Sequence, residues 1–239
     1  MKFFRFALTL IAATSIAAGT ARAGTIIATP AGLNPGDHFR IVFVTAGTIN
    51  PTSTNITTYD NFVTSQADSA TYNGATITWQ AIGSTSSVNA IDHIGVTGDA
   101  VYLVDGTEVA STDSTSGLWS GALLHAINEL ITGSTSGGST YTGTTASGVA
   151  STYYLGASAV EIGSTTSQNS SWVALSRDTR PTVDARLVFG ISQELTAAQT
   201  TSSVPEPSTA MLAGLGGLVA LAYSFKRKRG GGQSSSPSV

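Results

Sequence analysis

The side chains best suited to acid–base chemistry in this 239-residue chain are three histidines, His38, His93 and His125. His38 follows Asp37 and His93 follows Asp92. Because adjacent residues of a strand point to opposite faces, neither pair predicts a hydrogen-bonded Asp–His dyad. The H-x-x-x-H spacing of zinc hydrolases does not occur. We therefore expect these histidines to lie at the surface or in turns and to take no part in catalysis.

No nucleophile stands in a recognisable setting. Cysteine is absent, which excludes thiolate nucleophiles and thiolate metal sites. A serine nucleophile elbow requires G-x-S-x-G, and the segments 133–137 and 156–160 each lack one required residue. Glycosidase carboxylates meet in space rather than in sequence, so Glu108, Glu129 and Glu161 stay open as members of such a pair. No phosphate loop or dinucleotide fingerprint is present, and we expect no catalytic residue and no cofactor.

Aspartates recur at short intervals in the middle of the chain, and Ca²⁺ favours several oxygen ligands from an irregular loop. The set comprises Asp92, Asp99, Asp105 and Asp113. The D-x-D-x-D-G pattern of a calcium loop is missing, however. Asp105 stands directly before Gly106, where a tight turn explains it better. We expect no bound metal.

Runs of apolar and β-branched residues predict the strands. Phe39–Ala46 is apolar on both faces, which favours a central strand. Ala75–Ile82 is a second strand, with Trp79 as a buried anchor. Ser171–Ser176, which contains Trp172 as another core residue, and Ala185–Ile191 supply the closing strands.

One hairpin, two helices and one long loop complete the predicted elements. The Asp-Gly pair between the β-rich runs 101–104 and 107–110 predicts a hairpin with a two-residue type I′ turn. Tyr59–Ala70 has apolar residues at helical spacing, with Thr57 or Thr58 as its cap. Leu118–Ile131 is a second, weaker helix candidate. The Ser/Thr/Gly-rich segment 133–148 reads as a loop.

This order of elements predicts an α+β fold with a mainly antiparallel sheet and one or two short helices. It also resembles the C-type-lectin-like domains of the endostatin-related kind, in which a strand, a helix, a strand ending in a small-residue turn, a D-G hairpin and a late Trp-containing strand follow one another. The chain departs from that pattern in having no disulfides and no acidic-Pro-Asn calcium and sugar motif, so sugar binding does not carry over. The matching segments are 39–45, 59–70, 79–84, 101–109, Trp119, 142–144 and 172–175.

The N-terminus has the three regions of a secretory signal peptide. Two cations precede an apolar stretch over residues 6–18, and Ala21 and Ala23 form the A-x-A cleavage site. The apolar stretch is too short for a stable membrane span. We therefore expect the secretion translocon and signal peptidase as partners, with cleavage after Ala23 leaving Gly24 as the mature N-terminus.

The C-terminus combines a membrane-length helix with a basic stop. Residues 208–225 carry no charge and would span roughly 27 Å as a helix, near the minimum for a hydrocarbon core. By the positive-inside rule, the following cations keep the tail in the cytoplasm and residues 24–207 outside. These cations are Lys226, Arg227, Lys228 and Arg229.

Pro205, Glu206 and Pro207 stand just before this helix. Proline fixes φ and removes a backbone donor, which keeps the motif extended. Together with the helix and the basic cluster, the motif resembles the PEP-CTERM sorting signal of Gram-negative bacteria. The resemblance implies recognition by an exosortase in the inner membrane, cleavage near the motif and transfer to the cell surface or extracellular matrix. The Gly/Ser-rich extension 230–239 departs from the usual end of that signal.

The exported part is acidic. Residues 24–204 hold four arginines, no lysine and thirteen acidic residues, which gives a formal charge of −9, although the whole chain carries −3. Such a surface repels phosphate backbones, so we expect no nucleic-acid partner. An exopolysaccharide matrix bridged by divalent cations would suit it.

These features predict a signal peptide (1–23), an ectodomain (24–195), a linker (196–204), a sorting and anchor segment (205–229) and a disordered cytoplasmic tail (230–239). The leading hypothesis is a non-enzymatic surface or matrix protein that binds polysaccharide or packs against other surface proteins. It would be anchored transiently in the inner membrane, with its ectodomain in the periplasm, before it reaches the cell surface. The alternatives are a secreted glycan hydrolase and a structural coat protein with glycosylated Ser/Thr-rich loops.

Overall fold

Strand β1 (His38–Val44) runs through the middle of the largest sheet in the computed structural model, which describes residues 24–95, 98–112, 117–178 and 183–198. The strand order is β4-β10-β1-β5-β6, and β11 also pairs with β1. The β1–β5 pair is parallel and the other pairs are antiparallel, so the sheet is mixed. The prediction of a mostly antiparallel α+β arrangement with few helices is confirmed at that level.

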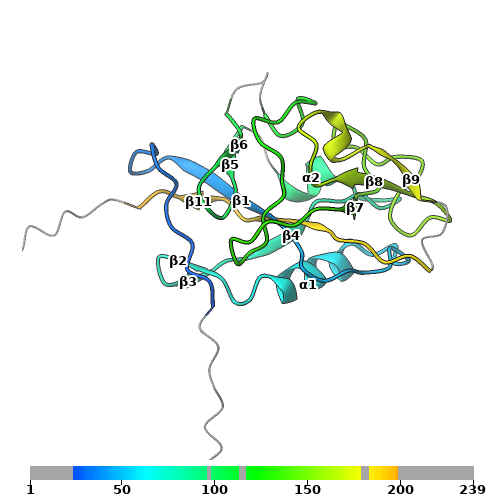
Figure 1. Ribbon diagram of the computed structural model, residues 1–239, viewed down its shortest axis with the longest axis horizontal. Coiled ribbons are helices and arrows are strands. Elements are labelled where there is room, and N and C mark those ends of the chain that lie inside the picture. Colours follow the sequence, from blue (N-terminus) through cyan, green and yellow to red (C-terminus); the bar gives the residue numbers. More distant parts are fainter. Residues whose placement is uncertain (1–23, 96–97, 113–116, 179–182, 199–239) are drawn as a thin grey trace, which may run out of the picture. The chain divides into compact units, whose positions relative to one another are not determined.

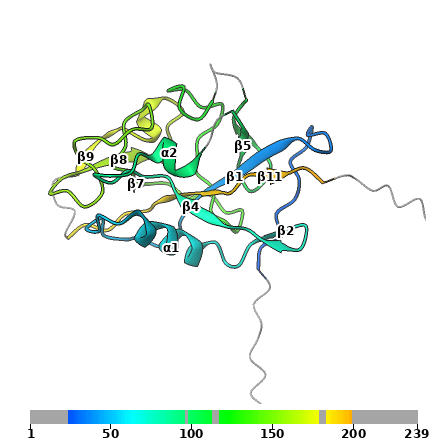
Figure 2. The same cartoon turned by 180° about the vertical axis from the view of Figure 1, so that it is seen from behind.

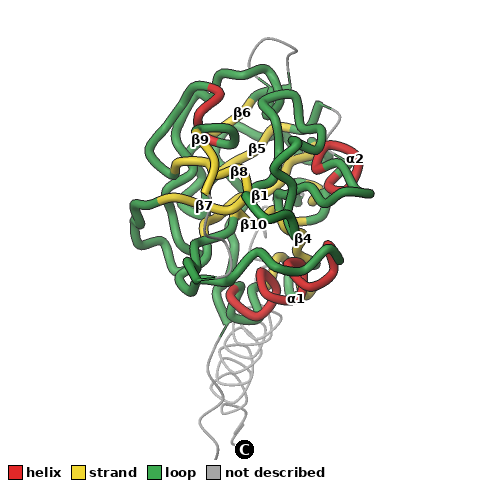
Figure 3. The backbone as a smooth tube through the Cα atoms, turned by 90° about the vertical axis from the view of Figure 1, so that its right-hand side faces the viewer, coloured by secondary structure: helices red, strands yellow, loops and turns green. Residues whose placement is uncertain are grey.

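The remaining elements form a three-stranded antiparallel sheet, β7-β8-β9, and the β2–β3 ribbon. Figures 1 and 2 show this sheet and the ribbon at opposite ends of the main sheet, with α1 beside β4. In Figure 3 the strands lie in the interior, and α1 and α2 lie outside them. The bounds are α1 (Ile56–Gln66), β2 (Thr71–Tyr72), β3 (Ala75–Thr76), β4 (Trp79–Ala81), α2 (Ala90–Ile94), β5 (Ala100–Tyr102), β6 (Glu108–Ala110), β7 (Ser139–Tyr141), β8 (Val160–Ser164), the 3₁₀ helix η1 (Ser170–Trp172), β9 (Ser176–Asp178), β10 (Phe189–Ser192) and β11 (Leu195–Thr196).

The side chains of β1 alternate between two hydrophobic cores, as the period of two along a strand requires. Phe39, Ile41 and Phe43 enter the first core, and Val42 and Val44 enter the second. All five are fully buried. The prediction of a central strand with two apolar faces is therefore confirmed.

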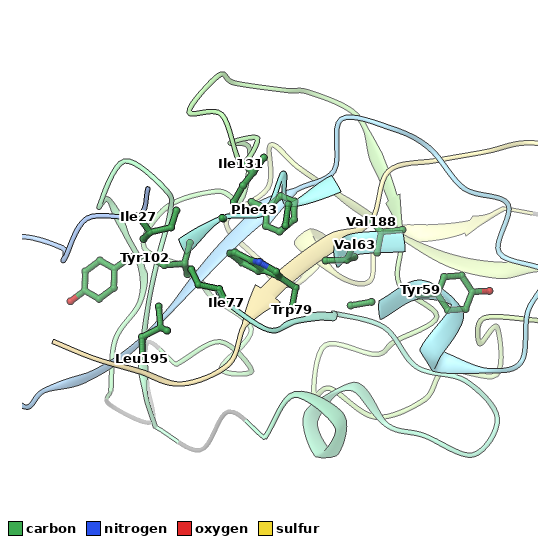
Figure 4. Close-up of a cluster of buried hydrophobic side chains, with 14 of the residues drawn as sticks. Ile27, Phe43, Tyr59, Val63, Ile77, Trp79, Tyr102, Ile131, Val188 and Leu195 are labelled. Carbon is green, nitrogen blue, oxygen red and sulfur yellow. The ribbon is translucent and has the colours of Figure 1, made fainter. Parts of the chain in front are cut away.

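The first core lies between the sheet and α1. Its centre is the pair Phe43 and Trp79, whose rings meet edge to face with centroids 4.9 Å apart (Figure 4). Tyr59 and Val63 of α1 are buried in the same core. Trp79 is therefore the buried anchor that the sequence predicts.

The second core lies on the other face of β1. Trp172 of η1 is fully buried there, with its ring 5.7 Å from that of Phe189 on β10. Leu123 and Ile127 belong to the same core although they lie outside any helix or strand. Irregular segments thus contribute to the second core together with the strands.

Helix α1 begins earlier than predicted and has a different cap. The side chain of Asn55 accepts a hydrogen bond from the backbone N–H of Thr57, so neither Thr57 nor Thr58 is the cap. Asparagine is among the strongest N-cap residues. The helix ends at Gln66, because Asp68 and Ser69 adopt positive φ values of 47° and 53° that no α-helix allows.

The predicted strand 75–82 is broken into β3 and β4. The backbone N–H of Ile77 bonds to Ala70 rather than to a sheet neighbour, which separates the two pieces. The first piece pairs with β2 in the ribbon, whereas the second forms the edge of the main sheet.

The predicted hairpin is present as β5 and β6, but its turn is not type I′. Gly106 has φ 89°, whereas Asp105 is not among the residues with positive φ. The N–H of Gly106 bonds to the carbonyl of Leu103, and the N–H of Leu103 bonds to the carbonyl of Thr107. This is the pattern of a three-residue loop in which a type I turn precedes a left-handed glycine.

Three further predictions were wrong. Residues 118–131 form no helix, although Leu118, Leu123, Ile127 and Ile131 are buried. Residues 133–148 are not all loop, because β7 lies within them. Residues 171–176 are not a strand, because η1 ends at Trp172 and β9 begins only at Ser176. In the first and third cases, tertiary packing uses the apolar residues without the regular structure that their spacing suggested.

The folded domain continues beyond residue 195, where the sequence predicts that the ectodomain ends. Strand β11 pairs Thr196 with His38, and the N–H of Ala197 bonds to the carbonyl of Asp37. In the part of the chain that the structure describes, no helix is both long and apolar enough to span a bilayer. The predicted signal peptide and C-terminal helix lie outside the described residues.

A buried arginine joins four parts of the fold. Arg40 projects from β1 among apolar neighbours and is 7% exposed. Its Nε lies 2.9 Å from Asp99 Oδ2, and its Nη1 donates to the carbonyl oxygens of Ile94 and Ser192. A cation at the C-terminal end of a helix also interacts favourably with the helix dipole, and α2 ends at Ile94.

We predict that Arg40→Ala lowers the free energy of unfolding by about 3–5 kcal/mol, because it leaves Asp99 and two buried carbonyls without their donor. Urea denaturation of the wild type and the variant measures this change. Arg177→Ala, which removes an exposed arginine, is the matched control and should cost less than about 1 kcal/mol. Equal losses in the two variants would contradict the structural role of Arg40.

Candidate functional site

Any catalytic site would draw on the acidic and basic side chains, and one histidine forms a partly buried pair with an aspartate. His93 lies on α2 and its Nε2 is 2.9 Å from Oδ1 of Asp60 on α1. The same Asp60 oxygen accepts the backbone N–H of Ala81 at 2.8 Å, and Gln80 donates to the carbonyl of His93. His93 is therefore no surface histidine. Its aspartate partner stands 33 residues away in sequence, and together they tie both helices to β4.

The other two histidines are exposed, as predicted. His38 Nδ1 lies 2.7 Å from Glu194 Oε1, with both side chains about half exposed. His125 Nδ1 lies 2.7 Å from the carbonyl oxygen of Glu108. Neither histidine pairs with an adjacent aspartate, in agreement with the sequence analysis.

The candidate glycosidase acids occupy different places. Glu129 is 4% exposed and its Oε2 accepts the backbone N–H of Asp105, which fixes the hairpin turn. Burial raises the pKa of Glu129 above its usual value, and the Asp105 hydrogen bond opposes that rise. Glu108 lies on β6 of the main sheet, and Glu161 lies on β8 of the three-stranded sheet.

The aspartate series does not form a common site in the structure. Asp92 accepts from the Asn89 amide, Asp99 pairs with Arg40, and Asp105 accepts the N–H of Thr107. Asp113 lies outside the described residues. Among the residues with described positions, no group of three or more His, Cys, Asp or Glu side chains could hold a metal ion.

A polar and aromatic cluster lies on the three-stranded sheet and the segment before β8. We call Ser151, Tyr153, Glu161 and Arg177 the Tyr153 cluster. Glu161 and Arg177 are direct cross-strand partners on β8 and β9. The Tyr153 carbonyl accepts the N–H of Glu161, which holds the preceding segment against β8. Three separate parts of the chain thereby come together.

The side chains of the Tyr153 cluster contact one another directly. The Arg177 guanidinium lies over the Tyr153 ring, 5.0 Å from its centroid, and Nη1 donates to the Tyr153 hydroxyl. Ser151 Oγ donates to Glu161 Oε2 at 3.2 Å and also accepts the N–H of Tyr153. Arg177 is exposed, and the Tyr153 and Glu161 side chains are half-buried.

The electrostatics of this cluster centre on Glu161. Burial raises the pKa of the Glu161 carboxyl, whereas the Ser151 hydrogen bond and the charge of Arg177 lower it. The result is a carboxyl with a raised pKa beside an exposed guanidinium. An aromatic ring, a planar cation, a carboxyl and a hydroxyl on one surface can bind the hydroxyl-rich, weakly apolar faces of sugars.

The tryptophans do not offer a comparable surface. Trp79 and Trp172 are 3% and 0% exposed, so they pack in the core as predicted. Trp119 is half-buried against Trp172, with ring centroids 5.6 Å apart. The Tyr153 ring is half-buried as well, but it differs from Trp119 in lying beneath the exposed Arg177 guanidinium.

A shallow pocket of about 210 Å³ lies at the end of α1. Gln66 lines it, and its side-chain oxygen accepts the backbone N–H of Gly47 at 2.7 Å. The full lining consists of Ala46, Ser65, Gln66, Asp68, Leu130, Ile131 and Thr132. It has no cation and no aromatic side chain, and the Tyr153 cluster is chemically richer.

The residues predicted for sorting and cleavage have no described structure. They are Ala21, Ala23, Pro205, Glu206, Pro207, Lys226, Arg227, Lys228 and Arg229. Residues 203–228 match the family model of the PEP-CTERM protein-sorting motif, which includes the Pro-Glu-Pro triplet and three of the four terminal cations. This match indicates an exported protein that an exosortase sorts to the cell surface. No curated protein matches the chain significantly.

Sequence reasoning missed both the Asp60–His93 pair and the Tyr153 cluster. Glu161 was a candidate acid, but nothing marked Ser151, Tyr153 or Arg177 as its neighbours. The available signal was the rarity of arginine, since four arginines occur in residues 24–204 and each deserves an explanation. It could not identify partners that only strand pairing brings together.

We predict that Arg177→Gln raises the pKa of Glu161 further, because the nearest favourable charge is removed. A ¹³C NMR titration of the Glu161 carboxyl measures the shift, and Arg177→Lys, which keeps the charge, should leave it closer to the wild type. Because the folded pKa is already raised, Glu161 contributes stability below its unfolded pKa and loses that contribution as pH rises through the folded value. An unchanged Glu161 pKa in Arg177→Gln would show that the two groups do not interact.

Proposed function

We propose that this exosortase-sorted protein is a non-enzymatic matrix protein whose ectodomain binds extracellular polysaccharide through the Tyr153 cluster. The sorting motif at residues 203–228 is the observation that carries the destination. The ligand class is inferred from the chemistry of the cluster. A surface that faces an extracellular matrix meets sugars in excess, and the half-buried Tyr153 ring and the exposed Arg177 guanidinium suit them.

The use of the carboxylates supports a binding role over a hydrolytic one. A glycosidase needs two carboxyl groups flanking one scissile bond, about 5–10 Å apart. In the described domain, Asp60, Asp99 and Glu129 each hold a backbone N–H or a cation of the fold. These three carboxylates have structural roles, and their removal would lower the stability of the domain. Glu161 has a raised pKa but stands beside Arg177 rather than beside a second acid.

The proposed route has two membrane steps. The signal peptide brings the chain to the translocon, and signal peptidase cuts after Ala23. The helix over residues 208–225 then holds the ectodomain on the periplasmic side, where the extended Pro-Glu-Pro segment meets the exosortase. The formal charge of −9 in residues 24–204 keeps the released domain soluble and away from nucleic acids.

We also propose that the domain is C-type-lectin-like. In support, β1 leads to α1 and then to β4, and the Asp-Gly hairpin follows as β5 and β6. Trp172 is a core residue but lies in a 3₁₀ helix rather than in a strand. The Tyr153 cluster stands on its own chemistry and does not depend on this resemblance.

A glycosylated coat protein is the competing proposal, favoured by the abundance of Ser and Thr in the described loops. Intact-mass measurement of the exported protein separates the two. A mass above that of the polypeptide favours the coat role, and the polypeptide mass favours unmodified binding loops.

We predict that replacing Pro205, Glu206 and Pro207 together by alanine abolishes C-terminal processing in cells that contain the exosortase. Wild-type protein should lose its C-terminal peptide, whereas the variant should keep it and stay in the membrane fraction. Ser235→Ala, in the tail, is the control and should be processed normally. Normal processing of the triple variant would refute the sorting role of the motif.

We predict that Tyr153→Ala weakens binding of the exported protein to exopolysaccharide from the same cells about tenfold, which corresponds to about 1.4 kcal/mol. Arg177→Ala should weaken it similarly, whereas Tyr153→Phe, which keeps the ring, should weaken it less. Thr152→Ala changes the exposed neighbour and serves as the control. Affinity electrophoresis or co-sedimentation measures the binding, and unchanged binding in both alanine variants would exclude the cluster.

A further inference from the structure

Gly24 packs unusually tightly against the segment that follows α1. A Cβ atom at this position would lie 2.4 Å from the backbone oxygen of Ser69 and 2.7 Å from that of Asp68. Real Cβ atoms do not approach other heavy atoms this closely. Both neighbours are backbone atoms, so no side-chain rotation can relieve the contact. Glycine is therefore the residue type that fits position 24 without a shift of the backbone.

Neighbouring hydrogen bonds hold Gly24 in this place. The N–H of Thr71 bonds to the carbonyl of Thr25 at 2.9 Å, and the N–H of Ile27 bonds to the carbonyl of Thr71 at 2.8 Å. Ile26 and Thr71 form a parallel bridge. Ile27 is buried in the first core, so the segment that begins at Gly24 is anchored within three residues of its start.

The surface that Gly24 meets favours a positive charge. α1 ends at Gln66, and the last carbonyls of a helix carry the negative end of its dipole. Asp68 and Ser69 follow after Ala67 in left-handed conformations, and their carbonyl oxygens lie close to Gly24. No side-chain cation is found in the last turn of α1.

We propose that the α-ammonium group created by cleavage after Ala23 binds the backbone oxygens of Asp68 and Ser69. Leader removal then places a cation near the end of α1, whose last turn contains no basic residue, and it ties the left-handed segment 68–69 to the new N-terminus. Export and completion of the fold are coupled in this way. The inference rests on the export step of the proposed function but not on polysaccharide binding.

The decisive variant moves the ammonium group without changing Gly24. One serine inserted between Ala23 and Gly24, with cleavage still after Ala23, would place the charge one residue away. We expect the exported full-length insertion variant to melt about 2–4 °C below the wild type at pH 7. N-terminal sequencing of both proteins establishes where each chain begins.

The pH dependence separates a charge effect from a packing effect. A free α-amino group has an ordinary pKa of about 7.7–8.0, and binding to carbonyl oxygens favours its charged form. The stability gain of the wild type should be fully present below that range and lost as pH rises through the folded value. The melting temperatures of the wild type and the insertion variant should therefore converge at about pH 10.

Gly24→Ala tests the close contact itself, with Gly137→Ala as the matched control. Gly137 has no neighbouring atom within 4 Å of a Cβ and no left-handed φ. The first substitution should lower the melting temperature and the second should leave it unchanged. If Gly24→Ala does not fold, the insertion variant still decides.

Equal melting temperatures of wild type and insertion variant at pH 7, or a mature N-terminus other than Gly24, would overturn the proposal. A constant difference at all pH values would also overturn it, because packing alone would then explain the effect. Polysaccharide binding measured on the same samples is a separate readout. Polysaccharide binding by Tyr153→Ala tests the proposed function, whereas the melting temperature of the insertion variant tests this inference.

Discussion

The burial of β1 on both faces is the constraint from which the rest of this domain follows. One strand with alternating Phe, Ile and Val side chains can be stable only if two separate layers cover it. α1 provides the first layer, and irregular segments around Trp172 provide the second. A shift of register by one residue would exchange the two sets and place Arg40 in the first core. The pairing of β1 is therefore fixed strongly by its own pattern.

Burial on both sides also explains the role of the few charged residues. Residues 24–204 contain only four arginines. Two of them, Arg40 and Arg186, form ion pairs with Asp99 and Asp178. Arg186 meets Asp178, which also accepts the hydroxyl of the buried Tyr141, so that burial and Asp178 raise the pKa of Tyr141. These ion pairs and hydrogen bonds stabilise a domain that has no cysteine and therefore no disulfide. The exposed Arg177 instead contacts Tyr153 at the surface.

The two ends and the centre of the chain solve different physical problems. The C-terminal end carries a sorting signal, for which a short linear pattern is sufficient, and the match over residues 203–228 reflects this. The centre must present a surface, and its function depends on which residues the strands bring together. Gly24 concerns both the N-terminal end and the centre of the chain, because it is the expected mature N-terminus and also a tightly packed residue of the domain.

The sequence by itself determined the sorting motif, the central strand with two apolar faces, the buried Trp79 and Trp172, and the Asp-Gly hairpin. Each of these rests on a local pattern, in which a few adjacent residues carry the whole signal. Tertiary structure alone decided the Asp60–His93 pair, the Tyr153 cluster and the irregular course of residues 118–131. Those features depend on contacts between segments far apart in the chain, and on packing that overrides helical spacing when a core needs the side chains but not the helix.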